Sequence, residues 1–492
     1  MTKSHPEDKA PALDLASPPD LASGPGSPRF VSGSTMGHIV SMTSAGAVGL
    51  VALFLVDLVD MYFISLLGES ALAAAIGFAG TVLFFTTSVS IGVAIATGAM
   101  VSQRVGAGDI AGARAAAIDN WLFGGIATSL FAAVVWYYTV DLLALLGATG
   151  ETLESATSYL RIIIPSMPVL ALAMMGGAIL RGIGDARIPM YSTLAGGAVN
   201  AVLDPIFIFW LDMGIDGAAW ASVVARFVVT AVSIGGVVAV HKFVAAPSLS
   251  RLWRQVPLIA VIAVPAILTN IATPFGNAYV TWALAPYGDS VMAGWAVIGR
   301  IIPVAFGVIF ALSGAIGPIY GQNFGAKRFD RVRNAFRDGL VFTTVFVGVV
   351  TILLFMVQDL VVEAFSLGGE GAVLVALFCT WLAPSFAFNG FLFVTNAAFN
   401  NLGRPKLATL FNWGRASLGT IPFVYAGAAL GGASGLLIGY FAGSVVFGLG
   451  AMWMGFRVIR QLSEAHTPPD DPKSEVCLNP RRPLWPFSSR RI

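Results

Sequence analysis

Cysteine and histidine are scarce in this sequence of 492 residues. Two cysteines cannot build a disulfide framework or a thiolate metal site. The four histidines lie in the tails or at the ends of apolar segments, and none has carboxylates at a metal-ligand spacing. Catalysis is left without supporting residues, so we expect neither an enzyme nor a resident cofactor. The residues concerned are Cys379, Cys477, His5, His38, His241 and His466.

Charged residues are also few. They make up 11% of the chain, against 57% hydrophobic residues, and the mean hydropathy is +0.81, which excludes a soluble domain. Apolar stretches recur from Met36 to Arg460, each long enough to cross a hydrocarbon core of about 30 Å as a helix. We expect an all-α integral membrane protein with twelve transmembrane helices in the lipid bilayer, and no nucleic-acid partner. The expected spans are 36–66, 71–99, 116–138, 155–180, 188–211, 215–241, 256–284, 290–319, 336–357, 372–400, 406–429 and 434–457.

The two ends of the chain have a different composition. The first thirty residues are rich in Pro, Ser, Ala and Gly, and they lack the apolar core of a signal peptide. The end from about Ser463 is similar. We expect disordered tails at 1–35 and 461–492.

The charges of the loops predict the orientation. Connections after odd-numbered spans hold mainly acids, such as Glu69 and Asp141. By the positive-inside rule, the basic connections after even-numbered spans are cytoplasmic, which places both termini in the cytoplasm of a cell-membrane protein. The basic residues are Arg104, Arg114, Arg181, Arg187, Lys242, Arg251, Arg254, Lys327, Arg328, Arg331, Arg333, Arg337, Arg404 and Lys406.

The sequence contains an internal repeat. The segment SQRVGAGDIAGAR after the second span matches GQNFGAKRFDRVR after the eighth at a shift of 219 residues, and the same shift aligns Gly184 with Gly403. The identical pairs in the first match are Gln103 and Gln322, Gly106 and Gly325, Ala107 and Ala326, and Arg114 and Arg333.

The repeat predicts the architecture. Each half has six spans, an even number, so the halves run in the same direction and are related by a pseudo-two-fold axis along the membrane normal. We expect six-helix lobes at 36–241 and 256–460, joined by a cytoplasmic linker at 242–255. Duplicated bundles of this kind enclose a cleft that can face either side, which favours a transporter of a small-molecule substrate. We expect it to be a monomer.

A few ionisable residues remain at membrane depth, where an aspartate costs roughly 2.5 to 3.5 kcal/mol on insertion scales. They could form buried structural pairs, or they could be functional. Arg226 could be a counter-charge for an acid, or it could have a structural role with its side chain extended toward the lipid headgroups. The set is Asp57, Asp60, Asp204, Arg226 and Arg300, with Asp119 and Arg415 nearer the ends of their spans.

The fifth span, with the sequence GGAVNAVLDPIFIFW, places Asn200 and Asp204 four residues apart on one helix face. Pro205 frees a nearby backbone carbonyl, and the sixth span places Ala218 and Ser222 on one face by the same spacing. Carboxylate, amide, hydroxyl and carbonyl oxygens can replace the water around a small hard cation. Alternatively, a carboxyl in this low-dielectric setting carries a proton. By itself, the asparagine would indicate a hydrogen bond between helices.

Several motifs, in this order, are similar to those of one known family. They are VDMYFISLLGESALAA (59–74), the repeated Gln-x-x-Gly-Ala loops, the loops at Gly184 and Gly403, and Asn200-x-x-x-Asp204-Pro205. On these motifs the region 36–460 resembles the multidrug and toxic compound extrusion (MATE) transporters, and within them the DinF-like branch.

The resemblance implies a cation site in the N-terminal lobe. It maps onto Asp60, Asn200, Asp204, the carbonyl of Ala218 and the hydroxyl of Ser222, with Na+ or H+ as the coupling ion.

Two departures from the family pattern matter. Asp57 stands where many relatives carry a neutral amide, and we keep it as a further candidate ligand. Other branches place functional acids in the C-terminal lobe, where this chain has Asn277 instead. A cation site in that lobe is not expected.

The resulting hypothesis is a secondary antiporter that exports lipophilic or cationic drugs, toxins or metabolites by alternating access. The alternative is a lipid-linked oligosaccharide flippase of related architecture, whose cleft should hold a pyrophosphate with several basic residues; this chain offers mainly Arg226 and Arg300. The predicted cleft residues are Phe84, Phe85, Met174, Met175, Phe275, Asn277, Tyr279 and Trp282.

Overall fold

The computed structural model describes residues 27–65 and 70–466, without the side chains at 55, 57–65, 70, 71 and 73. All the regular secondary structure of the described chain is helical, which confirms the predicted all-α membrane fold. The helices are α1 (Thr35–Ser65), α2 (Ser70–Gly106), α3 (Ile110–Tyr137), α4 (Thr139–Leu145), α5 (Gly150–Ile163), α6 (Met167–Gly182), α7 (Arg187–Pro205), α8 (Gly214–Gly235), α9 (Leu249–Leu284), α10 (Asp289–Gly325), α11 (Phe329–Ala364), α12 (Gly369–Leu377), α13 (Phe386–Asn401), α14 (Pro405–Ala416) and α15 (Ile421–Glu464).

Eleven helical segments in the described ranges are long and apolar enough to cross a membrane. The last of them, Pro405–Glu464, has 60 residues, or about 90 Å of helix, far more than a hydrocarbon core of about 30 Å requires. Within α15 the chain reverses at Gly431 and Gly432, and the φ of +58° at Gly432 favours glycine. Gly427 and Gly435 pack against each other on either side of this reversal. The segment therefore crosses twice, which gives the twelve predicted crossings.

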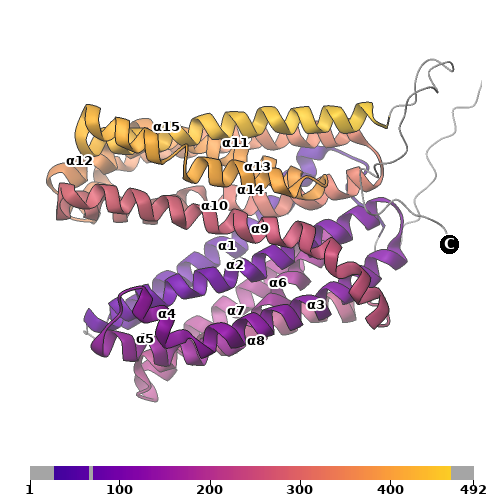
Figure 1. Ribbon diagram of the computed structural model, residues 1–492, viewed down its shortest axis with the longest axis horizontal. Helices are drawn as coiled ribbons and strands as arrows, with labels where there is room; N and C mark the ends of the chain where they lie inside the picture. Colours follow the sequence, from indigo (N-terminus) through magenta and orange to yellow (C-terminus); the bar gives the residue numbers. More distant parts are fainter. Residues whose placement is uncertain (1–26, 66–69, 467–492) are drawn as a thin grey trace, which may run out of the picture.

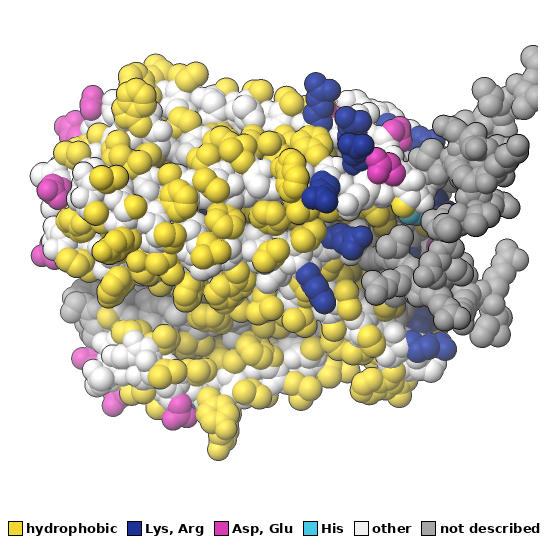
Figure 2. Space-filling view, turned by 45° about the horizontal axis from the view of Figure 1, so that its top comes forward, with side chains coloured by type: hydrophobic (Ala, Val, Ile, Leu, Met, Phe, Trp, Pro, Cys, Tyr) yellow, Lys and Arg dark blue, Asp and Glu magenta, His cyan; other side chains and the backbone are white. Residues whose placement is uncertain are grey.

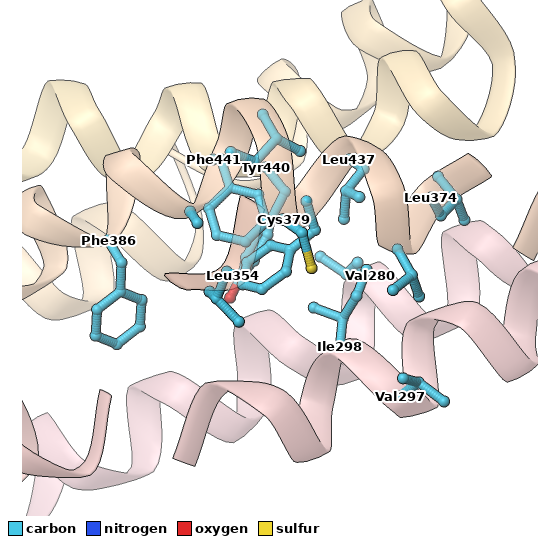
Figure 3. Close-up of a cluster of buried hydrophobic side chains, with 14 of the residues drawn as sticks. Val280, Val297, Ile298, Leu354, Leu374, Cys379, Phe386, Leu437, Tyr440 and Phe441 are labelled. Carbon is cyan, nitrogen blue, oxygen red and sulfur yellow. The ribbon is translucent and has the colours of Figure 1, made fainter. Parts of the chain in front are cut away.

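Figure 1 shows the helices in two groups, which we call the N-terminal lobe (α1–α8) and the C-terminal lobe (α9–α15). Buried apolar clusters lie in both lobes. One in the N-terminal lobe contains Met100 and Ile179, and one in the C-terminal lobe contains Val280, Ile298 and Phe441 (Figure 3). The cluster around Met100 also takes in Ile259 and Ala263 of α9. Burial of these side chains holds each lobe together.

The lobes meet through α1 and α2 on one side and α9 and α10 on the other. Glycines allow close approach: Gly92 of α2 packs against Ala263 and Ile267 of α9, and Gly325 of α10 against the backbone of Gln103. These contacts lie toward the C-terminal ends of α2 and α10. Near the start of α2, a Cβ atom added at Gly77 or Gly80 would have no described atom within 4 Å. The lobes therefore converge at one end and separate toward the other.

Basic side chains gather toward one end of the molecule in Figure 2, and acidic side chains dominate the opposite end. The end rich in Lys and Arg, which we call the basic end, carries the loops after α2, α6, α10 and α13. The contact between the lobes lies at this end, since Gly106 packs against Gln322 there.

Residues 27–34 differ from the predicted disordered tail at 1–35. Phe30 and Val31 are 3% and 4% exposed. The guanidinium of Arg331 donates to the carbonyls of Phe30, Ser32 and Gly33, each at 3.0 Å. These contacts satisfy backbone groups that a free tail would leave to water. The rest of that tail, and most of the predicted tail at 461–492, lies outside the described residues.

The linker predicted at 242–255, as a surface loop or a short interfacial helix, is partly helical in the structure. Helix α9 begins at Leu249, so residues 249–255 are helical and 242–248 form the connection. The first turns of α9 are held against α3 by Arg251, which donates to the buried carboxylate of Asp119. This ion pair with another helix fixes the segment. The apolar pattern of the sequence does not reveal such a contact.

Candidate functional site

Asn200 and Asp204 form a buried pair in α7. The Nδ2 of Asn200 donates to the Oδ2 of Asp204 at 2.8 Å, and Asp204 has no exposed surface. The spacing of four residues places both side chains on one face of the helix. Helix α7 ends at Pro205 and continues as a π-helical turn over Ile206–Trp210, a conformation that is frequent at functional sites.

Helix α8 runs antiparallel to α7 at this site. The hydroxyl of Ser192 in α7 donates to the carbonyl of Val229 in α8 at 2.7 Å. With a rise of 1.5 Å per residue, this register brings the pair in α7 level with Ala218 and Ser222. Ala218 is buried and Ser222 is half-buried. Four of the predicted cation-site residues thus lie at matching levels of two neighbouring helices.

Asp57 and Asp60 lie in the last turns of α1, and their side chains are outside the described residues. The α1 backbone does pass beside α7, because Val56 packs against Gly197. The two helices run in the same direction, so positions 57 and 60 are carried toward the level of the pair in α7. Whether these acids join the pair stays a prediction.

Arg226 has a structural environment in α8. Its Nη1 donates to the carbonyl of Ile163 at 3.0 Å and to the hydroxyl of Ser166 at 2.7 Å. Both acceptors lie where α5 gives way to α6, at a short 3₁₀ turn that contains Pro165. Arg226 therefore ties α8 to a helix break.

A polar stripe follows one face of α9 in the C-terminal lobe. Its members are spaced by four residues, which places successive members on one side of the helix, and they bond to several other helices. Thr269 pairs with Thr409 at 3.2 Å, Thr273 accepts from Arg415 at 3.3 Å, Asn277 accepts from Tyr440 at 2.9 Å and Thr281 accepts from Trp295 at 2.9 Å. Thr273 and Asn277 are exposed, so the stripe borders accessible space.

The predicted cleft residues of α9 point in different directions around the helix. At about 100° per residue, Asn277 lies near the face whose Ile259 and Ala263 pack in an apolar cluster with the N-terminal lobe. Phe275 and Trp282 point to roughly the opposite side of the helix, and both are exposed. Tyr279 contacts the Trp282 ring in a tilted arrangement, with centroids 5.6 Å apart. Among these four residues, only Asn277 faces the other lobe.

The predicted cleft residues of the N-terminal lobe divide similarly. Phe84 and Phe85 of α2 are exposed, and Phe85 lies two turns before Gly92 on the face that approaches α9. Met175 is completely buried in the lobe core, and Met174 packs against the same cluster. Met175 therefore contributes to packing and not to an accessible surface in this conformation.

Arg415 is the residue whose position sequence reasoning missed. We expected it nearer a span end, but α14 has only 12 residues and stops just after Arg415, deep in the lobe. Its side chain is 5% exposed. The turn-forming sequence Ser-Leu-Gly-Thr at 417–420, which interrupts the expected span, was the available signal.

No group of three or more His, Cys, Asp or Glu side chains that could hold a metal ion occurs in the part of the chain that the structure describes. A cation at the α7 pair would depend on Asp204, on neutral oxygens and on whatever the acids of α1 supply. This donor set suits Na+ or H+ better than a tightly held transition metal.

Comparison with known proteins places these features in context. The MatE family model matches residues 46–206 and 265–426, one segment in each lobe. The chain is 28% identical over 427 residues to an "FAD transporter" of Shewanella oneidensis, an alignment that covers 85% of this chain and 94% of the relative. It is 25% identical over 392 residues to the multidrug export protein MepA of Staphylococcus aureus, covering 77% and 84%.

A solved structure has the same fold. The crystal structure of the Vibrio cholerae MATE transporter VcmN in the bent form superposes with a TM-score of 0.81 and 26% sequence identity. The match covers 87% of this chain and 98% of that one. It includes both lobes.

Proposed function

The chain belongs to the MatE family of membrane transporters, and from this premise we propose that it is a secondary antiporter of the DinF-like branch. In the proposed cycle, Na+ or H+ enters at the acids of the N-terminal lobe and drives export of a lipophilic or cationic small molecule. The two lobes are the moving bodies, and the basic end lies in the cytoplasm. We propose a monomer, because one chain supplies both lobes.

The observation that carries this proposal is the buried pair in α7. Asp204 is fully buried at membrane depth beside Asn200 and level with Ser222. In contrast, the C-terminal lobe has no acid from 371 to 463, nor from 290 to 329. A buried acid is expensive in a membrane and marks an ion pathway by default. The coupling charge therefore belongs to the N-terminal lobe.

Entry of one cation supplies enough free energy to drive export of the substrate. One monovalent cation entering down a potential of 100 mV supplies about 2.3 kcal/mol, which corresponds to a roughly fifty-fold gradient of a neutral solute at one-to-one coupling. The coupling requires that the cation favour one conformation over the other, because a ligand of equal affinity for both shifts nothing.

The flippase alternative is not favoured. It requires several basic residues in the cleft to hold a pyrophosphate, but Arg226 is bound to Ile163 and Ser166 within its own lobe. One of the two arginines on which that alternative relied is thus engaged elsewhere.

The experiment is efflux from proteoliposomes with an imposed Na+ or proton gradient. Asp204→Asn keeps the side-chain volume and removes the charge, so we expect a folded protein without gradient-driven efflux. Asp60→Asn should also give a folded protein without gradient-driven efflux, and Asp57→Asn should reduce this efflux less. Full gradient-driven efflux by both Asp60→Asn and Asp204→Asn would show that the acids are structural.

A further inference from the structure

Arg415 lies at the centre of the C-terminal lobe. Helix α14 begins at Pro405 near the basic end, and ten residues of helix carry Arg415 about 15 Å inward, roughly half the thickness of a hydrocarbon core. The helix ends at the next residue, and α15 begins only at Ile421. The charge is therefore held at mid-membrane at the end of a broken helix.

The guanidinium of Arg415 has few partners. Its Nη2 donates to the Oγ1 of Thr273 at 3.3 Å, and its Nε is buried without an acceptor among the described residues. The C-terminal lobe offers no carboxylate at this depth. Residues 249–288, 290–329 and 371–463 contain no acid, and the innermost acid of α11 on the basic side, Asp338, accepts from Thr35 at the start of α1. A buried charge is costly unless it is paired and hydrogen-bonded. Arg226, the comparable arginine of the other lobe, bonds instead to a carbonyl and a hydroxyl.

Thr273 connects Arg415 to accessible space. Thr273 is exposed, as is Asn277 one turn farther along the polar stripe of α9. Thr273 and Asn277 lie near the face of α9 whose Ile259, Ile262 and Ala263 pack in an apolar cluster with the N-terminal lobe, closer to the basic end. A molecule between the lobes can therefore reach Thr273 and the guanidinium behind it.

The two lobes also differ in charge at membrane depth. The acids Asp57, Asp60 and Asp204 belong to the N-terminal lobe, where Arg226 is held at a helix break by Ile163 and Ser166. The C-terminal lobe contributes the basic residues Arg415 and Arg300, and Arg300 is exposed on α10. A coupling cation and an anion would thus have separate places, without competing for one site.

We propose that Arg415, reached through Thr273, binds an anionic group of the exported molecule, either a phosphate or a carboxylate. This inference rests on the proposed transport function. Among the lipophilic compounds proposed as substrates, it selects amphipathic molecules that carry an anionic group. A guanidinium suits both groups, because its planar set of N–H donors matches their paired oxygens.

The test measures binding by purified protein in nanodiscs, without an ion gradient. Riboflavin and flavin mononucleotide form one matched pair of probes, which differ by a phosphate. A rhodamine carboxylate and its methyl ester form the second pair. We expect the protein to prefer the anionic member of at least one pair about ten-fold or more, as one charge-assisted hydrogen bond allows. The pair that shows the preference identifies the group.

Arg415→Gln should reduce this preference to within about two-fold and leave affinity for the neutral member unchanged, and Arg415→Lys should retain part of it. Arg404→Gln, on the exposed start of the same helix, is the matched control and should bind as the parent does. The proposal is overturned if the parent shows no preference in either pair, or if Arg415→Gln keeps it.

A second measurement does not require Arg415 to be replaced. Thr273→Cys, in a background with Cys379→Ala and Cys477→Ala, should react with a thiol reagent more slowly in the presence of the anionic probe than with its neutral partner. Equal protection by both would also overturn the proposal. Binding preference without gradient-driven efflux would instead refute the antiport function and leave the anion site standing.

Discussion

Gln103 and Gln322 make reciprocal hydrogen bonds between the lobes. The Nε2 of Gln103 donates to the carbonyl of Asn401 at 2.8 Å, and the Nε2 of Gln322 donates to the carbonyl of Gly182 at 2.9 Å. The two donors are 219 residues apart in the sequence, and so are the two acceptors. Each repeat thus binds the other through the same side chain, at the basic end where the lobes converge.

These bonds should stabilise the conformation that is closed at the basic end. We expect Gln103→Ala and Gln322→Ala each to weaken closure by about 1 kcal/mol, roughly five-fold in population, and the double variant to weaken it further. The measurement is the rate of oxidative cross-linking between cysteines introduced at Ala107 and Ala326. An unchanged rate in the double variant would contradict this role.

Two glycines make this closure possible. A Cβ at Gly106 would overlap the backbone of Gln322, and a Cβ at Gly325 would overlap the backbone of Gln103. Because neither backbone can move independently of its helix, Gly106→Ala should hold the lobes apart and abolish export while the protein still folds. Gly77→Ala is the control, since no described atom lies within 4 Å of its Cβ position. Normal export by Gly106→Ala would show that the helices readily shift.

Features that follow from the length, repetition or spacing of sequence segments could be predicted. Apolar length located the twelve crossings, the 219-residue shift located the equivalent loops, and four-residue spacing located the pair of Asn200 and Asp204. Each of these properties is local or repeated along the chain, so composition and spacing reveal it.

Features that depend on distant contacts could not be predicted. The segment at Phe30 has a disordered composition, yet Arg331, some 300 residues away, orders its carbonyls. The cleft aromatics were chosen by residue type, whereas the facing side of α9 depends on how α2 packs against it. The depth of Arg415 in the lobe depends on where α14 ends, and the sequence pattern did not give that position.

Asp119 and Arg251 join α3 to the start of α9. The guanidinium donates to both carboxylate oxygens, at 2.5 and 3.0 Å, and Gln255 donates to Oδ2 at 2.7 Å. Arg251→Gln leaves a buried carboxylate without its counter-charge, so we expect a loss of about 3 kcal/mol in the free energy of unfolding. Adding Asp119→Asn should restore most of it. Thermal unfolding in nanodiscs checks both variants, and no recovery in the double variant would argue against the pair.

Asp185 should make stability depend on pH in the acid range. Burial alone would raise its pKa. The contact with His241 at 2.8 Å, together with the backbone N–H groups of Ile188 and Arg187, more than offsets this, so the pKa is lowered. A carboxyl with a lowered pKa in the folded state stabilises the protein above its unfolded pKa of about 3.9 and loses this contribution as the pH falls through the folded value.

Asp185→Asn replaces charge-assisted hydrogen bonds by neutral ones, so it should lower the melting temperature at pH 6 by an amount corresponding to about 1 kcal/mol, and have less effect near pH 3. Melting curves of parent and variant at the two pH values make the comparison. Parallel pH dependence in both proteins would mean that Asp185 does not contribute in this way.

Asn277 tests whether the C-terminal lobe takes part in ion coupling. It faces the other lobe, and its Oδ1 accepts from the hydroxyl of Tyr440 at 2.9 Å. A neutral amide cannot balance the charge of a bound cation. Apart from Asp289, the first residue of α10, neither α9 nor α10 contains an acid.

Asn277→Ala should therefore cost about 1 kcal/mol of stability through the lost hydrogen bond and keep gradient-driven efflux. Asp204→Asn, in contrast, should keep its fold and lose that efflux. The ratio of efflux with a gradient to efflux without one separates the two effects. If Asn277→Ala removed the gradient dependence in a protein that was folded and present at normal levels, the coupling site would extend into the C-terminal lobe, and confining it to the N-terminal acids would be wrong.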